Sequence, residues 1–175
     1  MSIPAALTAL LSLGPAYGLQ LHSELGTRLA HRANTNVGQI YSTLDRLVRD
    51  GLVERRGETE DGLPLYALTD QGRSSVTQWL GADWVTPATS WSDVLDVLQL
   101  GATLPGFDPE PTCARVEREF SEPLYDSPSL AERASTHFAT AVRAVVTDIR
   151  AARDSGTLPQ TPLTTIRPTR GRRPA

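Results

Sequence analysis

The segment 36–69 constrains the fold of this chain more than any other. It begins with an amphipathic stretch, 37–50, which Gly51 stops, and it continues with two runs of β-favouring residues within 52–68. The pair Asp61-Gly62 lies between these runs, and an Asp-Gly pair flanked by such residues predicts a β-hairpin. A helix followed directly by a protruding hairpin is the element order of a winged helix-turn-helix.

Apolar periodicity predicts further helices on both sides of this segment. They are expected over 3–13, 16–30, 70–80, 91–104, 112–124 and 130–153. The predicted fold is therefore mainly α with a small β-hairpin wing. It comprises an N-terminal winged helix-turn-helix over 1–82, a helical dimerisation segment over 83–155, and a disordered Arg/Pro-rich tail over 156–175.

The net charge of −3 is unevenly distributed, because 1–82 carries −1, 83–155 carries −6 and 156–175 carries +4. Only the charge near a contact surface governs attraction to phosphates, so the overall acidity does not exclude nucleic-acid binding. No apolar run approaches the ~18 residues of a membrane span. Without a basic leader at its start, the chain is expected to be cytoplasmic and not to contact membranes. The single cysteine, Cys113, excludes an internal disulfide and a cysteine-based zinc site.

The stretch 37–50 has two different faces. Its apolar positions recur at helical spacing and form one stripe, made of Val37, Ile40, Leu44, Leu47 and Val48. The polar residues Gln39, Ser42, Thr43, Arg46 and Arg49 are expected on the opposite side, with Tyr41 at the seam. Thr35 or Asn36 is expected to cap the helix.

This polar face suits the major groove of duplex DNA. Gln pairs with adenine, Arg with guanine, and Ser or Thr with bases or phosphates. Gly38 would permit close approach of a phosphate to the helix start. The predicted DNA contacts are Thr35, Asn36, Gly38, Gln39, Tyr41, Ser42, Thr43, Arg46, Arg49, Arg55 and Arg56. The alternative is a solvated polar face, which is common on surface helices. The hairpin that directly follows this helix favours DNA binding over that alternative.

The hairpin tip is acidic. It carries Glu58, Glu60 and Asp61, whose charges would repel phosphates most strongly at low salt. Insertion of the tip into the minor groove of DNA is therefore not expected. Arg55 and Arg56 at the base of the hairpin are the better candidates for backbone contact.

Four runs of the chain resemble the PadR family of winged-helix transcriptional regulators. They are Leu11-Ser-Leu-Gly-Pro-Ala-Tyr-Gly18, Gly38-Gln-Ile-Tyr-Ser-Thr-Leu-Asp-Arg-Leu47, Asp50-Gly-Leu-Val53 and Tyr66-Ala-Leu-Thr-Asp-Gln-Gly72. The resemblance covers about 3–82. It implies a homodimeric DNA-binding regulator, usually a repressor and often released by a small molecule. Two departures are Ser42, where the family often has proline, and the acidic hairpin tip.

The last predicted helix carries a narrow apolar seam. Its members at intervals of three or four are Ala134, Phe138, Ala141, Val145, Ile149 and Ala152. Such a seam serves either dimerisation or packing within the chain. Together with the resemblance it favours a homodimer, whose two heads would read an inverted repeat with half-sites ~34 Å apart.

Three tryptophans, Trp79, Trp84 and Trp91, lie near the junction of head and helical segment. They could stack on a small aromatic effector or simply pack in the core. No cofactor or metal is implied, and no catalytic motif is present: His22, His31 and His137 are dispersed along the chain. The alternative to a DNA-binding regulator is a protein-interaction module that keeps the winged scaffold without binding DNA.

Overall fold

The computed structural model describes residues 2–121 and 129–165. Within these residues the fold is mainly helical with one two-stranded hairpin, which confirms the predicted fold class. The elements in chain order are α1 Ser2–Leu11, α2 Gly18–Arg28, the short 3-10 turn η1 Ala30–Arg32, α3 Val37–Arg49, β1 Val53–Glu58, β2 Pro64–Leu68, α4 Asp70–Leu80, α5 Trp91–Thr103, α6 Glu110–Glu119 and α7 Leu130–Asp154.

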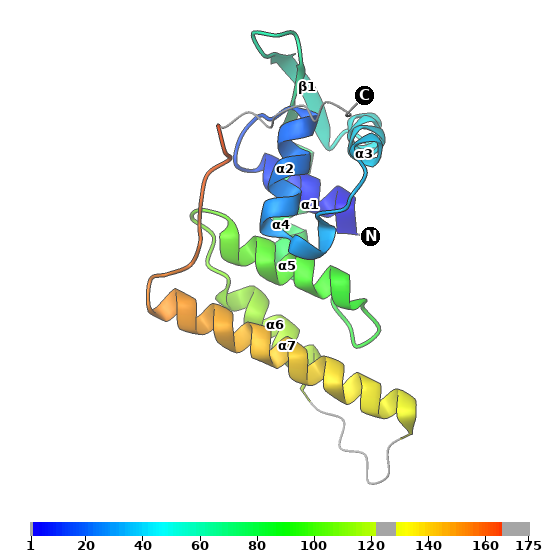
Figure 1. Cartoon of the computed structure of the whole chain (residues 1–175), viewed down its shortest axis with the longest axis vertical. Coiled ribbons are helices and arrows are strands. Elements are labelled where there is room, and N and C mark those ends of the chain that lie inside the picture. Colours follow the sequence, from blue (N-terminus) through cyan, green and yellow to red (C-terminus); the bar gives the residue numbers. More distant parts are fainter. Residues whose placement is uncertain (1, 122–128, 166–175) are drawn as a thin grey trace, which may run out of the picture.

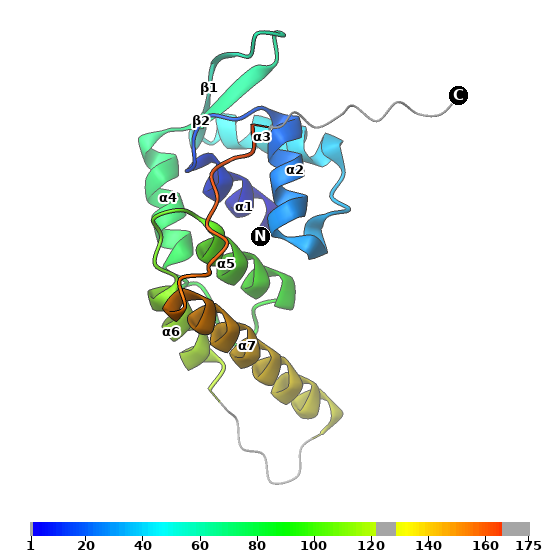
Figure 2. The same cartoon turned by 60° about the vertical axis from the view of Figure 1, so that its left-hand side comes forward.

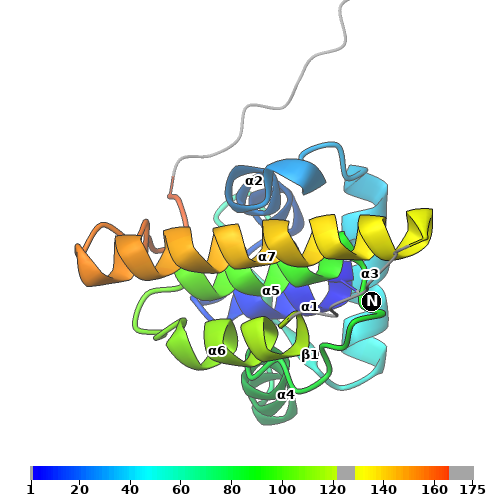
Figure 3. The same ribbon diagram turned by 90° about the horizontal axis from the view of Figure 1, so that it is seen from below.

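The elements are arranged along one long axis. Helices α1 to α4 and the hairpin form a head at one end, with the hairpin projecting from it (Figure 1). Helix α5 lies beneath the head, and α6 and α7 form the opposite end. Seen from below, α7 runs along α5 and lies beside α6 (Figure 3).

A continuous core connects these layers. The inner flank of α3 is buried through Ile40, Leu44 and Leu47, which pack in the same cluster as α1. The cluster continues through α5 into α7, where Val142 and Val146 are fully buried. Burial of these apolar side chains is the main force that holds the layers together. The core is not interrupted near residue 82, where the sequence suggested a domain boundary.

The hairpin is anchored at its base on both sides. Strands β1 and β2 are antiparallel with Val53 opposite Leu68, and the register shifts between Arg55 and Glu58. On its other side β2 pairs with Ala16, whose backbone N–H and carbonyl bond Tyr66 at 3.0 and 2.9 Å. At Tyr66, strand β2 therefore has neighbours on both sides.

A buried ionic cluster joins α5 to the turn that precedes α3. The Asp96 carboxylate is 0% exposed. One of its oxygens lies 2.7 Å from His31 Nε2, and the other accepts from Arg32 Nη2 at 2.9 Å. Since an unpaired carboxylate is costly to bury, this cluster holds η1 in one position on α5.

The segment 156–165 returns from the end of α7 to the head (Figures 1 and 2). We call it the strap. Arg28 donates to the strap carbonyls of Thr161 and Pro162 at 2.8 and 3.1 Å. The backbone N–H of Thr164 donates to Glu24 at 2.6 Å, and Glu24 also accepts from Arg28 at 2.8 Å. The side chains of Arg28 and Glu24 are only 4% and 5% exposed.

The disorder predicted from Gly156 therefore does not hold for the strap. The strap lacks apolar periodicity, but its backbone groups bond polar side chains of α2, which the sequence pattern could not indicate. The predicted role of the tail arginines, Arg167, Arg170, Arg172 and Arg173, falls on residues outside those that the structure describes.

A chain ending at residue 155 should be less stable than one ending at 165. Without the strap, Glu24 and Arg28 lose hydrogen-bond partners, at a cost of about 1–3 kcal/mol of unfolding free energy. Urea denaturation followed by circular dichroism measures the difference. The chain ending at 165 is the control, because it keeps the strap. Equal midpoints for the two chains would contradict a stabilising role of the strap.

Cys113 is fully buried on α6, and burial raises the pKa of its thiol to about 11. This agrees with a packed helix residue rather than a reactive one. Over 2–121 and 129–165, no cluster of three or more His, Cys, Asp or Glu side chains is placed to hold a metal. None of the helices described there is long and apolar enough to cross a membrane.

Candidate nucleic-acid interface

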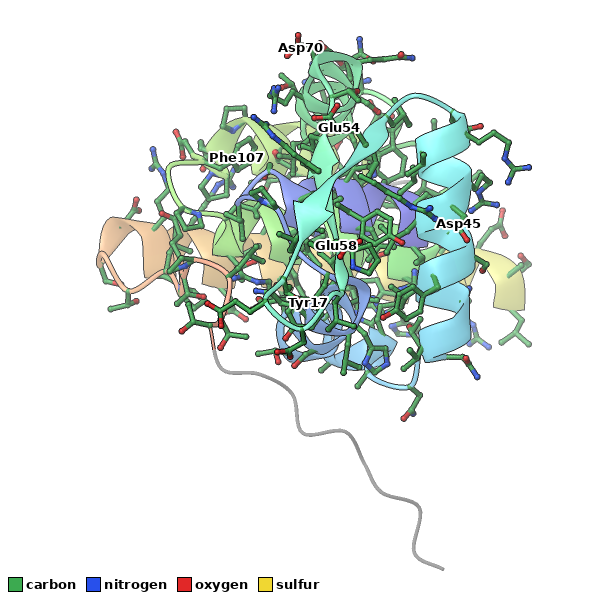
Figure 4. The ribbon with its side chains drawn as sticks, turned by 90° about the horizontal axis from the view of Figure 1, so that it is seen from above. Tyr17, Asp45, Glu54, Glu58, Asp70 and Phe107 are labelled. Atoms are coloured by element: carbon green, nitrogen blue, oxygen red, sulfur yellow. The ribbon has the colours of Figure 1, made fainter. Side chains whose placement is uncertain are left out.

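Helix α3 lies beside the hairpin at the projecting end of the molecule (Figures 1 and 4). Asn36 caps its start, because its side chain accepts a hydrogen bond from the Gly38 N–H at 2.7 Å. Its end is set by Gly51, which adopts a φ of 74°. The cap and the glycine stop thus fix the length of the helix beside the hairpin.

The outer face of α3 carries the polar residues that the sequence placed there. Gln39, Ser42, Arg46 and Arg49 are exposed. The Ser42 hydroxyl donates to the Gln39 carbonyl at 3.1 Å. These side chains form a surface of donors and acceptors next to the hairpin, in the arrangement that suits base edges and phosphates.

Thr43 does not belong to this face, and its predicted outward position is wrong. It is only 4% exposed, because it lies three residues after Ile40 and four before Leu47 on the buried flank. Val37 differs from its prediction in the opposite sense. It was expected in the buried apolar stripe, but its side chain is 36% exposed. The ring of Tyr41 is half-buried against Gly18, where an added Cβ would lie 2.5 Å from its Cε1.

The residues at the start of α3 are engaged within the chain. Because the Gly38 N–H bonds the Asn36 side chain, it is not open to a phosphate as the sequence suggested. Thr35 is similarly occupied, since its hydroxyl donates to the Arg32 carbonyl at 2.7 Å and its own carbonyl lies 2.8 Å from His22 Nε2. This segment therefore positions the helix.

The arginines near the hairpin fall into two groups. Arg55 donates to Asp45 of α3 at 2.7 Å, and this bond raises the pKa of its guanidinium. The guanidinium groups of Arg46, Arg49 and Arg56, by contrast, have no hydrogen bond or ion pair to any residue within 2–121 or 129–165. Three exposed cations thus remain on α3 and β1.

Asp45 is a site residue that sequence reasoning did not single out. It lies on the side of α3 that faces the hairpin (Figure 4), where it bonds Arg55. No local pattern relates these two residues, which stand on different elements. Glu58, Glu60 and Asp61 at the tip are also charged and lie at or near the surface.

The predicted dimerisation seam on α7 faces partly into the protein. Ile149 is buried, in line with Val142 and Val146. The ring of Phe138 packs against Trp91 and Phe120, with centroids 5.2 and 4.9 Å apart. Of the remaining predicted members, Ala141 and Val145 are half-buried, and Ala134 is exposed.

The three tryptophans are not gathered in one place. Trp79 and Trp84 stack with ring planes 7° apart and centroids 6.2 Å apart, and both line a cavity beside α1 and α4. Trp91 is not among the residues that line this cavity and instead packs against α7. Two of the three predicted effector residues, Trp79 and Trp84, therefore lie at the same cavity.

The fold and this surface define a winged helix-turn-helix protein with a helical C-terminal segment. Residues 7–78 match the family model described as "Transcriptional regulator PadR-like family", which confirms the resemblance found in the sequence. A similar solved structure is the crystal structure of Bacillus subtilis PadR in complex with operator DNA. The similarity covers 89% of this chain and 97% of that chain, with a sequence identity of 18% and a TM-score of 0.44. No curated protein matches the chain.

Proposed function

We propose that this PadR-like regulator binds duplex DNA through the outer face of α3. The observation that carries the proposal is the set of exposed, unpaired guanidinium groups of Arg46, Arg49 and Arg56 within the described part of the chain. Arg46 and Arg49 stand on α3, whose apolar flank is fixed in the core, so the outer face of this helix is held rigidly. Rigid presentation of donors lowers the entropic cost of contacting DNA.

The residues of this surface take different roles in the proposal. Arg46 and Gln39 lie mid-helix, where side chains reach base edges in the major groove. Arg49 at the helix end and Arg56 on β1 are better placed for phosphates, which position the protein without selecting a sequence. Arg55 is assigned to holding the hairpin against α3 through Asp45.

We further propose that the protein acts as a homodimeric repressor. One head offers few contacts, whereas two heads linked through α7 would read an inverted repeat with half-sites ~34 Å apart. The exposed N-terminal part of α7, including Ala134 and the 75% exposed Leu130, supplies apolar surface for the partner. Release from DNA by a small aromatic molecule at the Trp79–Trp84 cavity completes the proposal.

Selection of bound fragments from the source genome, followed by fluorescence anisotropy at several salt concentrations, tests this function. The expected result is one enriched inverted repeat, bound with an affinity that falls as salt rises. Enrichment of no common sequence, together with salt-independent or absent binding, would overturn the proposal. That result would favour a protein-interaction module instead, for which the acidic tip of the hairpin is the supporting feature.

Neutralising the hairpin tip with Glu58→Gln and Glu60→Gln should tighten DNA binding about threefold at low salt and less at high salt. Glu58 and Glu60 follow Arg56, a proposed phosphate contact, by two and four residues, and ions screen their repulsion of phosphates. The matched control neutralises Asp148 and Asp154 on α7, which lies at the opposite end of the molecule (Figure 1). If both double variants tightened DNA binding equally, the effect would come from the net charge of the protein and not from the position of the tip.

A further inference from the structure

The end of the strap is bonded to the start of α2 in the head (Figure 2). The backbone N–H of Thr164 donates to Glu24 at 2.6 Å, and its carbonyl accepts from Gln20 Nε2 at 2.9 Å. Gln20 and Glu24 are four residues apart on α2, so they lie on the same face of this helix. Both backbone polar groups of Thr164 are therefore held by one helix.

The strap is also held along the rest of its course. Leu158 and Leu163 pack against the core. The Gln160 side chain donates to the carbonyl of Phe107 at 2.8 Å, and Arg28 bonds two strap carbonyls. The strap therefore carries the chain from the end of α7 to the head along one path, and it ends at a fixed place.

This place lies next to the proposed DNA surface. Gly18, the first residue of α2, contacts the ring of Tyr41 in α3, since an added Cβ would lie 2.5 Å from Cε1 of that ring. Two residues before Gly18, Ala16 pairs with Tyr66 of β2. Gln20, which bonds the strap, belongs to the first turn of the same helix. The strap therefore ends beside α3 and the base of the hairpin.

The charge of the chain changes where the strap ends. The strap, 156–165, contains no charged residue. The ten residues 166–175, which we call the basic segment, contain four arginines and no acid. Ten residues span at most about 35 Å, so these arginines stay within that reach of the start of α2. They are Arg167, Arg170, Arg172 and Arg173.

We propose that the strap delivers the basic segment to the phosphates of DNA bound at α3, where its arginines make a second contact that does not select sequence. Guanidinium groups bind phosphate oxygens in a bidentate manner. Attachment at α2, and not at the distant end of α7, raises the effective concentration of these groups at the DNA. The contact rests on the proposed function of α3.

The alternative occupant of the basic segment is the acidic tip of the hairpin, with Glu58, Glu60 and Asp61. DNA is the stronger attractor, because duplex DNA carries one negative charge per ~1.7 Å of its axis and releases counterions when cations bind it. The tip offers three carboxylates and no comparable counterion release.

Anisotropy titrations of the selected operator over a series of salt concentrations test the contact. The full chain with all four arginines of the basic segment replaced by glutamine should bind about tenfold more weakly at low salt. The slope of log affinity against log salt should become less steep by about 2–4 per bound chain. Unchanged affinity and slope would overturn this contact alone. Absence of salt-dependent binding by the natural chain would overturn the proposed function of α3 as well.

A matched pair of double variants separates position from net charge. Arg172→Gln with Arg173→Gln should lower the slope by about 2. Arg118→Gln with Arg133→Gln removes the same charge from exposed positions on α6 and α7, at the opposite end of the molecule, and should leave the slope unchanged. Equal changes in the two double variants would overturn the contact.

The same titrations with a neutral hairpin tip distinguish DNA from the tip as the occupant. In a chain that carries Glu58→Gln and Glu60→Gln, neutralising the four arginines should still weaken DNA binding about tenfold. If this loss disappeared, the basic segment would act by neutralising the tip, and the proposed contact with phosphates would be wrong.

A flexible insertion tests the role of the strap. About 30 Gly and Ser residues placed between Thr165 and Ile166 keep the strap and all charges, but they lower the effective concentration of the arginines at the DNA. Binding at low salt should weaken about threefold. The same insertion after Ala175 is the control and should change nothing. Equal affinities of the two chains would overturn the delivery of the basic segment by the strap.

Discussion

Replacing Arg46 by alanine should weaken binding to the operator about 5- to 150-fold, or about 1–3 kcal/mol. Its guanidinium is exposed in the middle of α3 and is bound to no other side chain within 2–121 and 129–165. The variant should therefore keep its fold and lose only contacts made with DNA. Discrimination between the operator and variants with one guanine replaced should decrease as well, because a base contact selects sequence.

Anisotropy titrations with the operator and with single-base variants measure both effects. Arg118→Ala is the matched control, since Arg118 is an exposed arginine on α6, away from the head. The Arg118→Ala variant should bind the operator as tightly as the natural sequence does at the same salt concentration. If Arg46→Ala weakened binding to all DNA sequences equally, Arg46 would be a phosphate contact. The proposal that α3 recognises bases in the major groove would then lose its main support.

Replacing Asp96 by alanine should lower the free energy of unfolding by about 3–5 kcal/mol, the usual loss when one partner of a buried ion pair is removed. The carboxylate is fully buried and binds both Arg32 and His31. Its removal takes from Arg32, whose side chain is 19% exposed, the carboxylate that it bonds at 2.9 Å. Urea denaturation followed by circular dichroism gives the magnitude.

The control for Asp96 is Asp148→Ala on the exposed face of α7, where a loss within about 0.5 kcal/mol is expected. The loss of unfolding free energy for Asp96→Asn should fall between those for Asp96→Ala and Asp148→Ala, because the amide keeps the shape and one acceptor but loses the charge. Similar losses for Asp96→Ala and Asp148→Ala would show that the cluster does not hold η1 on α5.

The head could be predicted from the sequence because its signals are local. The cap at Asn36, the stop at Gly51 and the turn at Asp61-Gly62 all lie within the elements that they define. Thr43 was misplaced because the buried flank of α3 is wider than the stripe of apolar residues. Its methyl-bearing side chain fits between Ile40 and Leu47, whereas a strict division into polar and apolar residues assigned it to solvent.

The ion pairs between distant segments could not be predicted. The pairs Asp45 with Arg55 and Asp96 with Arg32 depend on how the elements pack, and no local spacing in the sequence relates the two partners. On α2, Glu24 and Arg28 are spaced like an ordinary surface pair on a helix. They are buried because the strap covers them, and the strap binds through backbone groups that are the same in every sequence.

The double anchoring of β2 also bears on solubility. A strand with an unpaired edge can recruit a strand from another molecule and start aggregation. At Tyr66 the inner strand has no such edge, since Ala16 occupies it. The outer strand, Val53-Glu-Arg-Arg-Gly-Glu58, carries a charge at four of its six positions and bends at its register shift. The hairpin can therefore project far from the protein without offering a template for intermolecular sheet growth.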